Sequence, residues 1–313
     1  MLGLGAVVLA GSRVQATPAR PVPVFFTPEY VGAAHAFETT RKAGWVAQSL
    51  RRDPLPGISL RPNKPLAEAD LLKVHSAEYV NAVRTGEPRA LAQSQGFAWD
   101  RQLWPMVLAS NGGVLAASSA ALANGVAGAL SSGLHHARRE RGAGFCTFNG
   151  LALAALQALE SGAKRILILD LDAHCGGGTH SLLGRNRAVR QLDVAVDAFD
   201  HYQPAGGNTL DMVESAAQYL PTIRRRLASL GAEHFDLCLY NAGMDPHQFC
   251  PVGGLPGIGR AILARREAMV FSWCRARRLP VAFVLAGGYV SDRLDETALV
   301  DLHRLTLRAA VQA

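Results

Sequence analysis

The feature that most constrains the fold is the alternation of short apolar runs with longer stretches that have helical spacing. The runs are continuously apolar, as expected for parallel strands that helices cover on both faces. The predicted strands span 22–26, 126–130, 166–169, 194–196, 237–240 and 281–285, and the predicted helices span 33–50, 67–83, 104–123, 149–161, 212–230 and 258–277. The pattern predicts an α/β fold with a mostly parallel sheet.

The length and composition fit one large domain. The 313 residues are 49% apolar and 18% charged, which suffices to fill the core of a single α/β domain. We expect this domain over 21–313 and an N-terminal extension over 1–20. The extension begins with a short apolar stretch that no Lys or Arg precedes. We therefore interpret it as a disordered tail or a start-site artefact, with a signal peptide as the alternative.

The charge pattern and the cysteines argue against several classes of protein. The formal charge of +7 comes mainly from scattered arginines, and only 7% of residues are aromatic, so we expect no nucleic-acid binding. No apolar run approaches the roughly 20 residues that span a bilayer, so we expect no membrane contact. The five cysteines form no C-x-x-C pair, which indicates neither a disulfide framework nor a thiolate zinc site and favours a cytoplasmic location. The sequence is compatible with an oligomer.

Reactive or glycine-rich segments follow four of the predicted strands. These segments are 131–136, 170–174, 241–245 and 286–289. Open parallel sheets place their sites beyond the carboxyl ends of the strands, so we expect the four segments to meet at one edge of the sheet.

The segment after the third predicted strand carries Asp170, Asp172 and His174 at a spacing of two. In an extended segment this spacing puts all three side chains on one side, so two can bind a cation while the third supports them. Asp245 follows another strand and would complete a set of one histidine and two carboxylates. Such a set leaves room for a water, as a catalytic metal requires. A helix N-cap is the alternative for any one aspartate.

Two further strand ends carry candidate groups for proton chemistry. His135 and His136 are adjacent, and a neutral imidazole near a metal can take a proton from water and return it to a leaving amine. A lone histidine at such a place would more often be structural. Tyr289 follows two glycines that indicate a close backbone approach, and its phenol can donate to an oxyanion. A half-buried structural aromatic is the alternative.

These segments belong to motifs that closely resemble the zinc-dependent histone deacetylase family. The motifs are Gly133-Leu134-His135-His136-Ala137, Gly144-Phe145-Cys146-x-x-Asn149, Asp170-Leu171-Asp172-Ala173-His174 and Gly287-Gly288-Tyr289. The similarity begins near Phe26 and covers most of the chain. The segment from Tyr240 to Asp245 is similar to class IV members and to bacterial histone deacetylase-like amidohydrolases.

The resemblance implies a single-domain, arginase-like fold with three α/β/α layers, and a deacetylase that acts on acetylated lysine or another acetylated amine. It implies one Zn2+ per chain, bound by Asp172, His174 and Asp245. Family members often hold a monovalent cation such as K+ near the strand that ends at Asp170. The resemblance leaves the ligands of that cation open.

The resemblance also implies roles for the remaining site residues. His136 would be the general base and acid, and His135 would be its electrostatic partner, held by Asp170. Tyr289 would polarise the substrate carbonyl. The residues expected to contact the substrate are Gly144, Phe145 and Gly288.

The chain departs from the family at three positions. Gly177 stands where the family commonly has the aspartate that orients the base histidine, Cys250 stands where another acid is common, and Ala286 replaces a glycine. We therefore expect His136 to lack a carboxylate partner. Unless Gly177 has a positive φ, we expect Gly177→Asp to raise kcat/KM and to move the acidic limb of the pH profile upward.

Two rival functions stay open. A dinuclear ureohydrolase of the arginase type would need one more acid after His174 and another after Asp245, and the sequence has neither. A weakly active binding or regulatory protein would keep the fold and the metal. Gly177 argues for this alternative, and the intact His136 and Tyr289 argue against it. Acetyl-lysine peptides, acetylated polyamines and small acetylated metabolites all fit the predicted chemistry.

Overall fold

An eight-stranded sheet in the order β2-β1-β3-β8-β7-β4-β5-β6 forms the centre of the protein, and every strand pair is parallel. The computed structural model describes residues 21–33 and 38–312. The strands are β1 (Val22–Phe25), β2 (Ile58–Arg61), β3 (Val126–Ala129), β4 (Ile166–Asp170), β5 (Val189–Ala195), β6 (Thr209–Met212), β7 (Leu237–Ala242) and β8 (Val281–Leu285). The predicted α/β class is confirmed, and the predicted extension over 1–20 lies outside the described residues.

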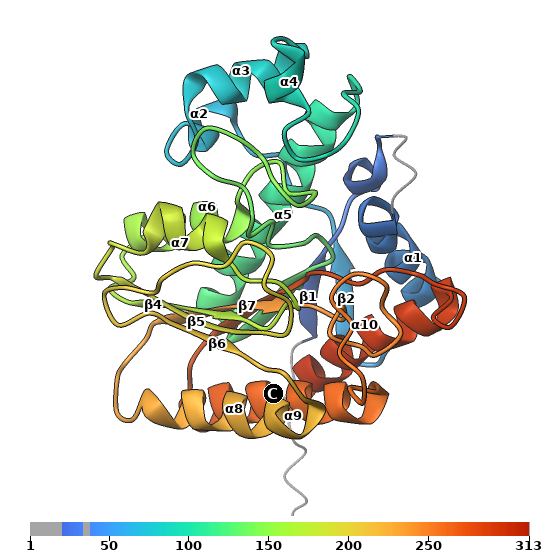
Figure 1. Ribbon diagram of the computed structural model, residues 1–313, viewed down its shortest axis with the longest axis vertical. Helices are drawn as coiled ribbons and strands as arrows, with labels where there is room; N and C mark the ends of the chain where they lie inside the picture. The colour runs from blue at the N-terminus through green and yellow to red at the C-terminus, as the bar shows by residue number, and fades with distance from the viewer. Residues whose placement is uncertain (1–20, 34–37, 313) are drawn as a thin grey trace, which may run out of the picture.

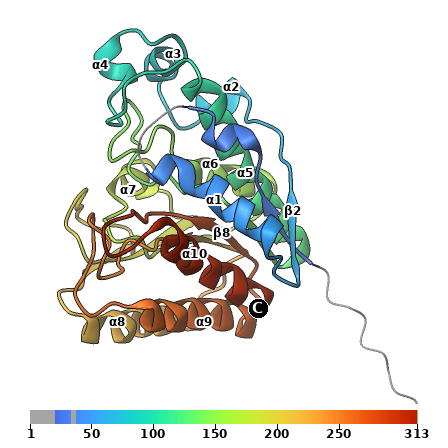
Figure 2. The ribbon, with the colours of Figure 1, turned by 90° about the vertical axis from the view of Figure 1, so that its right-hand side faces the viewer.

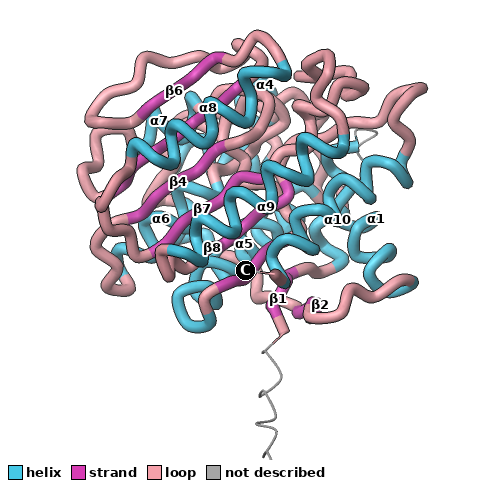
Figure 3. Tube along the Cα trace, turned by 90° about the horizontal axis from the view of Figure 1, so that it is seen from below, coloured by secondary structure: helices cyan, strands magenta, loops and turns pink. Residues whose placement is uncertain are grey.

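Helices cover both faces of this sheet. They are the 3-10 helix η1 (Pro28–Val31), α1 (Glu38–Arg52), α2 (Glu68–Leu71), α3 (Ala77–Thr85), α4 (Arg89–Ala92), α5 (Leu103–Asn124), α6 (Gly150–Glu160), α7 (Gly177–Leu183), α8 (Ala216–Ser229), α9 (Arg260–Ala276) and α10 (Glu296–Val311). α8 and α9 lie on one face, and α5 and α6 lie on the opposite face (Figures 1 and 3). The short helices α2, α3 and α4 form a separate group at one end of the molecule (Figure 2).

The central strand β4 divides its side chains between the hydrophobic cores of the two faces. Ile166 and Ile168 pack into the core that α5 and α6 build, whereas Leu167 and Leu169 pack into the core of α8 and α9. Side chains of a strand alternate between faces, so a strand covered on both faces needs an apolar residue at every position. This requirement explains the continuous apolar runs in the sequence.

Helix α5 is long and apolar enough to cross a membrane, but 61% of its apolar window is buried inside the domain. The helix contacts β3, β8 and α6. Its apolar character on all sides is that of a helix in the core of a large domain.

Several predicted element boundaries are wrong. The predicted helix 67–83 is two helices, because the Ser76 hydroxyl accepts the Tyr79 N–H and caps a new start at α3. The predicted helix 212–230 begins only at Ala216, since Met212 ends the edge strand β6. The first part of the predicted helix 33–50 falls on residues 34–37, outside the described part. The edge strands β2 and β6 and the helix α10 were not predicted.

Candidate active site

The strands that carry the candidate residues are neighbours in the middle of the sheet. Their order is β3-β8-β7-β4-β5, and each contributes the segment beyond its carboxyl end. Because all pairings are parallel, these segments meet at one edge. The predicted meeting of the four strand ends is therefore present in the structure, and the end of β5 joins them.

Asp172, His174 and Asp245 form a buried cluster at this edge. One ligand atom from each lies within 4.8 Å of the others. His174 Nδ1 is 3.0 Å from Asp172 Oδ1 and 3.2 Å from Asp245 Oδ2. In the part of the chain that the structure describes, this is the only group of three or more acidic, histidine or cysteine side chains with such spacing. One imidazole and two carboxylates form a donor set that could hold a metal ion.

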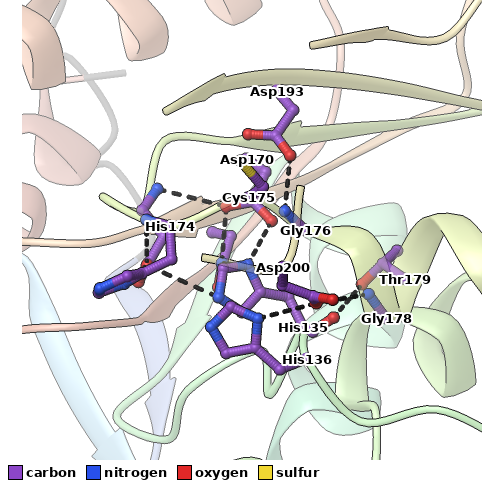
Figure 4. A network of polar contacts seen from close by, with 12 residues as sticks. His135, His136, Asp170, His174, Cys175, Gly176, Gly178, Thr179, Asp193 and Asp200 are labelled. Carbon is purple, nitrogen blue, oxygen red and sulfur yellow. Dashed lines mark hydrogen bonds and ion pairs between the residues drawn. The ribbon is translucent and has the colours of Figure 1, made fainter. Parts of the chain in front are cut away.

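The two adjacent histidines each contact a carboxylate through Nδ1 (Figure 4). His135 Nδ1 is 2.8 Å from Asp170 Oδ2, as the resemblance implies. Burial disfavours the charged ring, but Asp170 and Asp172 outweigh it and raise the pKa of His135 to about 10. Burial, and then the charge on His135, lower the pKa of His136 to about 4. The two rings, 3.9 Å apart at their centroids, therefore favour different protonation states.

The expectation that His136 lacks a carboxylate partner is wrong. Asp200, from the loop after β5, places Oδ2 3.0 Å from His136 Nδ1 (Figure 4). The structure removes the reason for the expected gain from Gly177→Asp, and a Cβ on Gly177 would lie 2.2 Å from the Asp200 carbonyl oxygen. Sequence patterns missed Asp200 because the predicted strand 194–196 gave no reason to inspect a loop residue beyond it.

A cavity of about 480 Å³ opens above the cluster. Its wall includes Gly144 and Phe145, the predicted substrate contacts, and the ring of Phe199. A smaller space of about 20 Å³ continues from it toward Asp172 and Gly287. The residues that line both spaces are His136, Gly144, Phe145, His174 and Tyr289. A narrow apolar chain can reach the cluster along this path.

Tyr289 is 7% exposed and lines the cavity. Burial, and then the charge of Asp245, raise the pKa of its phenol well above the ordinary value, so the hydroxyl keeps its proton. Gly288 takes a different position from the one predicted. Among the described residues it lines neither space, and a Cβ built on it would meet His303 and Leu299 on α10 at 2.9 Å.

The eight-stranded parallel sheet is that of the predicted arginase-like α/β fold, and the buried acid–imidazole cluster at its edge is a candidate metal centre. The family model of the histone deacetylase domain matches residues 35–304. The chain therefore belongs to the histone deacetylase family, and it is a deacetylase, a hydrolase that acts on amide bonds.

Relatives in sequence agree with this assignment, and solved structures share the fold. An uncharacterized protein of Picosynechococcus is 34% identical over 76% of this chain and 80% of its own. Histone deacetylase 2 of Arabidopsis thaliana is 29% identical over 72% of this chain and 62% of its own. The acetylpolyamine aminohydrolase structure from Burkholderia pseudomallei shares the fold, with a TM-score of 0.77, 21% identity and coverage of 92% and 98%. The HDA15 HD domain also has a TM-score of 0.77, at 20% identity with coverage of 94% and 90%.

Proposed function

We propose that the chain is a zinc-dependent deacetylase that hydrolyses the acetyl-amide bond of an acetylated amine. Asp172, His174 and Asp245 would hold the zinc. The observation that carries the proposal is the position of this buried cluster at the end of a cavity that His136 and Tyr289 also line.

The donor set fits zinc. Three protein ligands of these types leave a fourth position for a water or a substrate. Asp245 Oδ2 is buried and lies 3.2 Å from His174 Nδ1, another member of the donor set. Burial, and then the charge of Asp172, raise the pKa of Asp245 to about 6, and a cation would offset this repulsion. When bound, zinc polarises the amide carbonyl and lowers the pKa of a water toward about 7.

Protein side chains would move the protons. With Nδ1 of His136 donating to Asp200, Nε2 is left to take a proton from the attacking water and return it to the leaving amine. The Tyr289 hydroxyl, which keeps its proton, would donate to the carbonyl oxygen as negative charge develops there. Phe145 and Phe199 would enclose the aliphatic chain of the substrate.

A monovalent cation such as K+ would belong beside β4. Asp193 on β5 is fully buried, and its Oδ1 accepts no hydrogen bond from the described residues. Burial, and then the charge of Asp170, raise the pKa of Asp193 well above its ordinary value. A cation near these two carboxylates would reduce that cost.

The substrate class proposed is an acetylated lysine or another acetylated amine on a flexible chain, and a cytoplasmic location is part of the proposal. The alternative of a weakly active regulatory protein rested on Gly177, which has no carboxylate for His136. Asp200 supplies that carboxylate, so this alternative loses its support. A dinuclear ureohydrolase would need more ligands than the three in the cluster.

The test is a deacetylation screen across acetyl-lysine peptides, acetylated polyamines and small acetylated metabolites, with zinc measured on the same sample. We expect turnover with at least one group, and His136→Ala should retain zinc while losing about 10² to 10⁴ in rate. His234→Ala is the matched control, because His234 is exposed at the surface. Equal turnover in wild type and His136→Ala would contradict the assignment of the base.

A further inference from the structure

Asp200, the carboxylate partner of His136, lies outside the family motifs in the sequence. The Asp200 side chain is only 7% exposed. Its Oδ2 lies 3.0 Å from His136 Nδ1 and also accepts the Gly178 N–H at 2.8 Å (Figure 4). Its Oδ1 pairs with the Arg138 guanidinium. Partners from two other segments therefore fix the carboxylate against the ring.

The backbone around Asp200 is adapted to this contact. Asp200 has a φ of 60°, in the left-handed region that few residues other than glycine, asparagine and aspartate adopt. A Cβ on Gly177 would lie 2.2 Å from the Asp200 carbonyl oxygen and 2.7 Å from Oδ1. Only glycine at 177 leaves room for Asp200. The glycine at 177 is therefore required by the position of the acid at 200.

We propose that Asp200 is the positioning residue for His136 in this chain, acting from the loop after β5 in place of an acid at 177. The inference rests on the proposed function, in which His136 is the base. By accepting the Nδ1 proton, the carboxylate keeps Nε2 unprotonated for the proton of the attacking water, and it stabilises the imidazolium that forms. Arg138 holds the carboxylate in place from its other oxygen.

The main test is Asp200→Asn, which keeps the size of the side chain but can donate to Nδ1. We expect kcat to fall about 10- to 100-fold, with KM and zinc content close to wild type. NMR of the protein labelled with ¹⁵N-histidine should show His136 protonated at Nδ1 in wild type and at Nε2 in Asp200→Asn. Unchanged kcat together with an unchanged tautomer would overturn the proposal.

A second variant perturbs the contact and leaves the carboxylate in the chain. Gly177→Ala should displace Asp200 from His136 and produce the same loss of kcat, whether or not Asp200→Asn folds. Asp236→Asn is the matched control, because Asp236 accepts backbone N–H groups of Lys164 and Arg165 away from the cavity. It should keep wild-type kcat. Full kcat in Gly177→Ala would count against the positioning role.

The outcomes separate this inference from the proposed function. If the wild type hydrolyses no acetyl-amide, the proposed function fails. If the wild type is active and His136→Ala is not, but Asp200→Asn and Gly177→Ala both match wild type, only the role of Asp200 fails.

Discussion

The backbone N–H of Gly287 donates a 2.7 Å hydrogen bond to Oδ2 of Asp172. This bond ties the segment after β8 to the candidate metal ligand after β4. It also brings the Gly287 Cα so close that a Cβ there would lie 1.9 Å from Asp245 Oδ2 and 2.7 Å from Asp172 Oδ2. The close backbone approach that the glycines before Tyr289 predict is therefore an approach to the carboxylates of two candidate metal ligands.

Gly287→Ala should weaken zinc binding by at least about 10-fold, because the added methyl group displaces the carboxylate of Asp245. The measurement is the dissociation constant of zinc, by competition with a chelator. Gly259→Ala is the control, since a Cβ there has ordinary contact with Gln248 at 3.7 Å. Wild-type zinc affinity in Gly287→Ala would contradict the crowded geometry.

Tyr289→Phe should lower kcat by around 10² to 10³ and change KM little, because the hydroxyl would bind the oxyanion best in the transition state. Steady-state kinetics on a good substrate measures both constants. Tyr30→Phe is the control, because the Tyr30 hydroxyl donates to Asn63 and Tyr30 lines neither of the two spaces, and its kcat should stay at the wild-type value. A change confined to KM in Tyr289→Phe would show that the phenol only binds substrate.

Among the described residues, Asp197 is the only acid on the wall of the larger cavity, and no Lys or Arg lines that wall. Asp197→Asn should therefore raise KM several-fold for acetylated diamines that carry a free ammonium group. Neutral N-alkylacetamides of equal length should show no such change. Equal effects on both substrate sets would mean that Asp197 does not select for positive charge.

His75 should make the protein less stable below neutral pH. Its Nε2 accepts the Asn149 N–H at 3.0 Å and its Nδ1 lies 2.8 Å from the Arg138 carbonyl oxygen. Burial lowers the pKa of His75 to about 4, from 6.5. The unfolded chain therefore binds the proton more readily, so stability is complete above pH 6.5 and is lost as the pH falls toward 4, by about 3 kcal/mol.

Urea unfolding at a series of pH values measures this loss. His75→Gln has no titratable ring at this position, so its free energy of unfolding should fall less between pH 6.5 and 4 than that of the wild type. Parallel pH profiles for the two proteins would show that His75 does not titrate as expected.

The sequence predicted the central strands well because each is buried on both faces, as the alternating cores around Leu167 and Ile168 illustrate. The edge strands β2 and β6 lack this signal, since they are short and partly exposed. The start of β5 was missed because Arg190, Gln191 and Asp193 interrupt its apolar run.

The candidate site was predictable where its residues share a motif directly after a strand, as Asp170 and His174 do. Asp200 was not, because its role depends on the loop after β5 folding back onto His136. No local pattern encodes that contact. The reason for glycine at 177 was not predictable either, because it depends on the contact of Gly177 with Asp200.

Titration of zinc into metal-free protein, with activity measured at each addition, tests the central claim most directly. We predict that activity rises linearly and stops rising at one zinc per chain, and that Asp245→Asn and His174→Ala neither retain zinc nor gain activity. Full activity in the metal-free protein, or stoichiometric zinc in either variant, would contradict the assignment of Asp172, His174 and Asp245 as the ligands of a catalytic zinc.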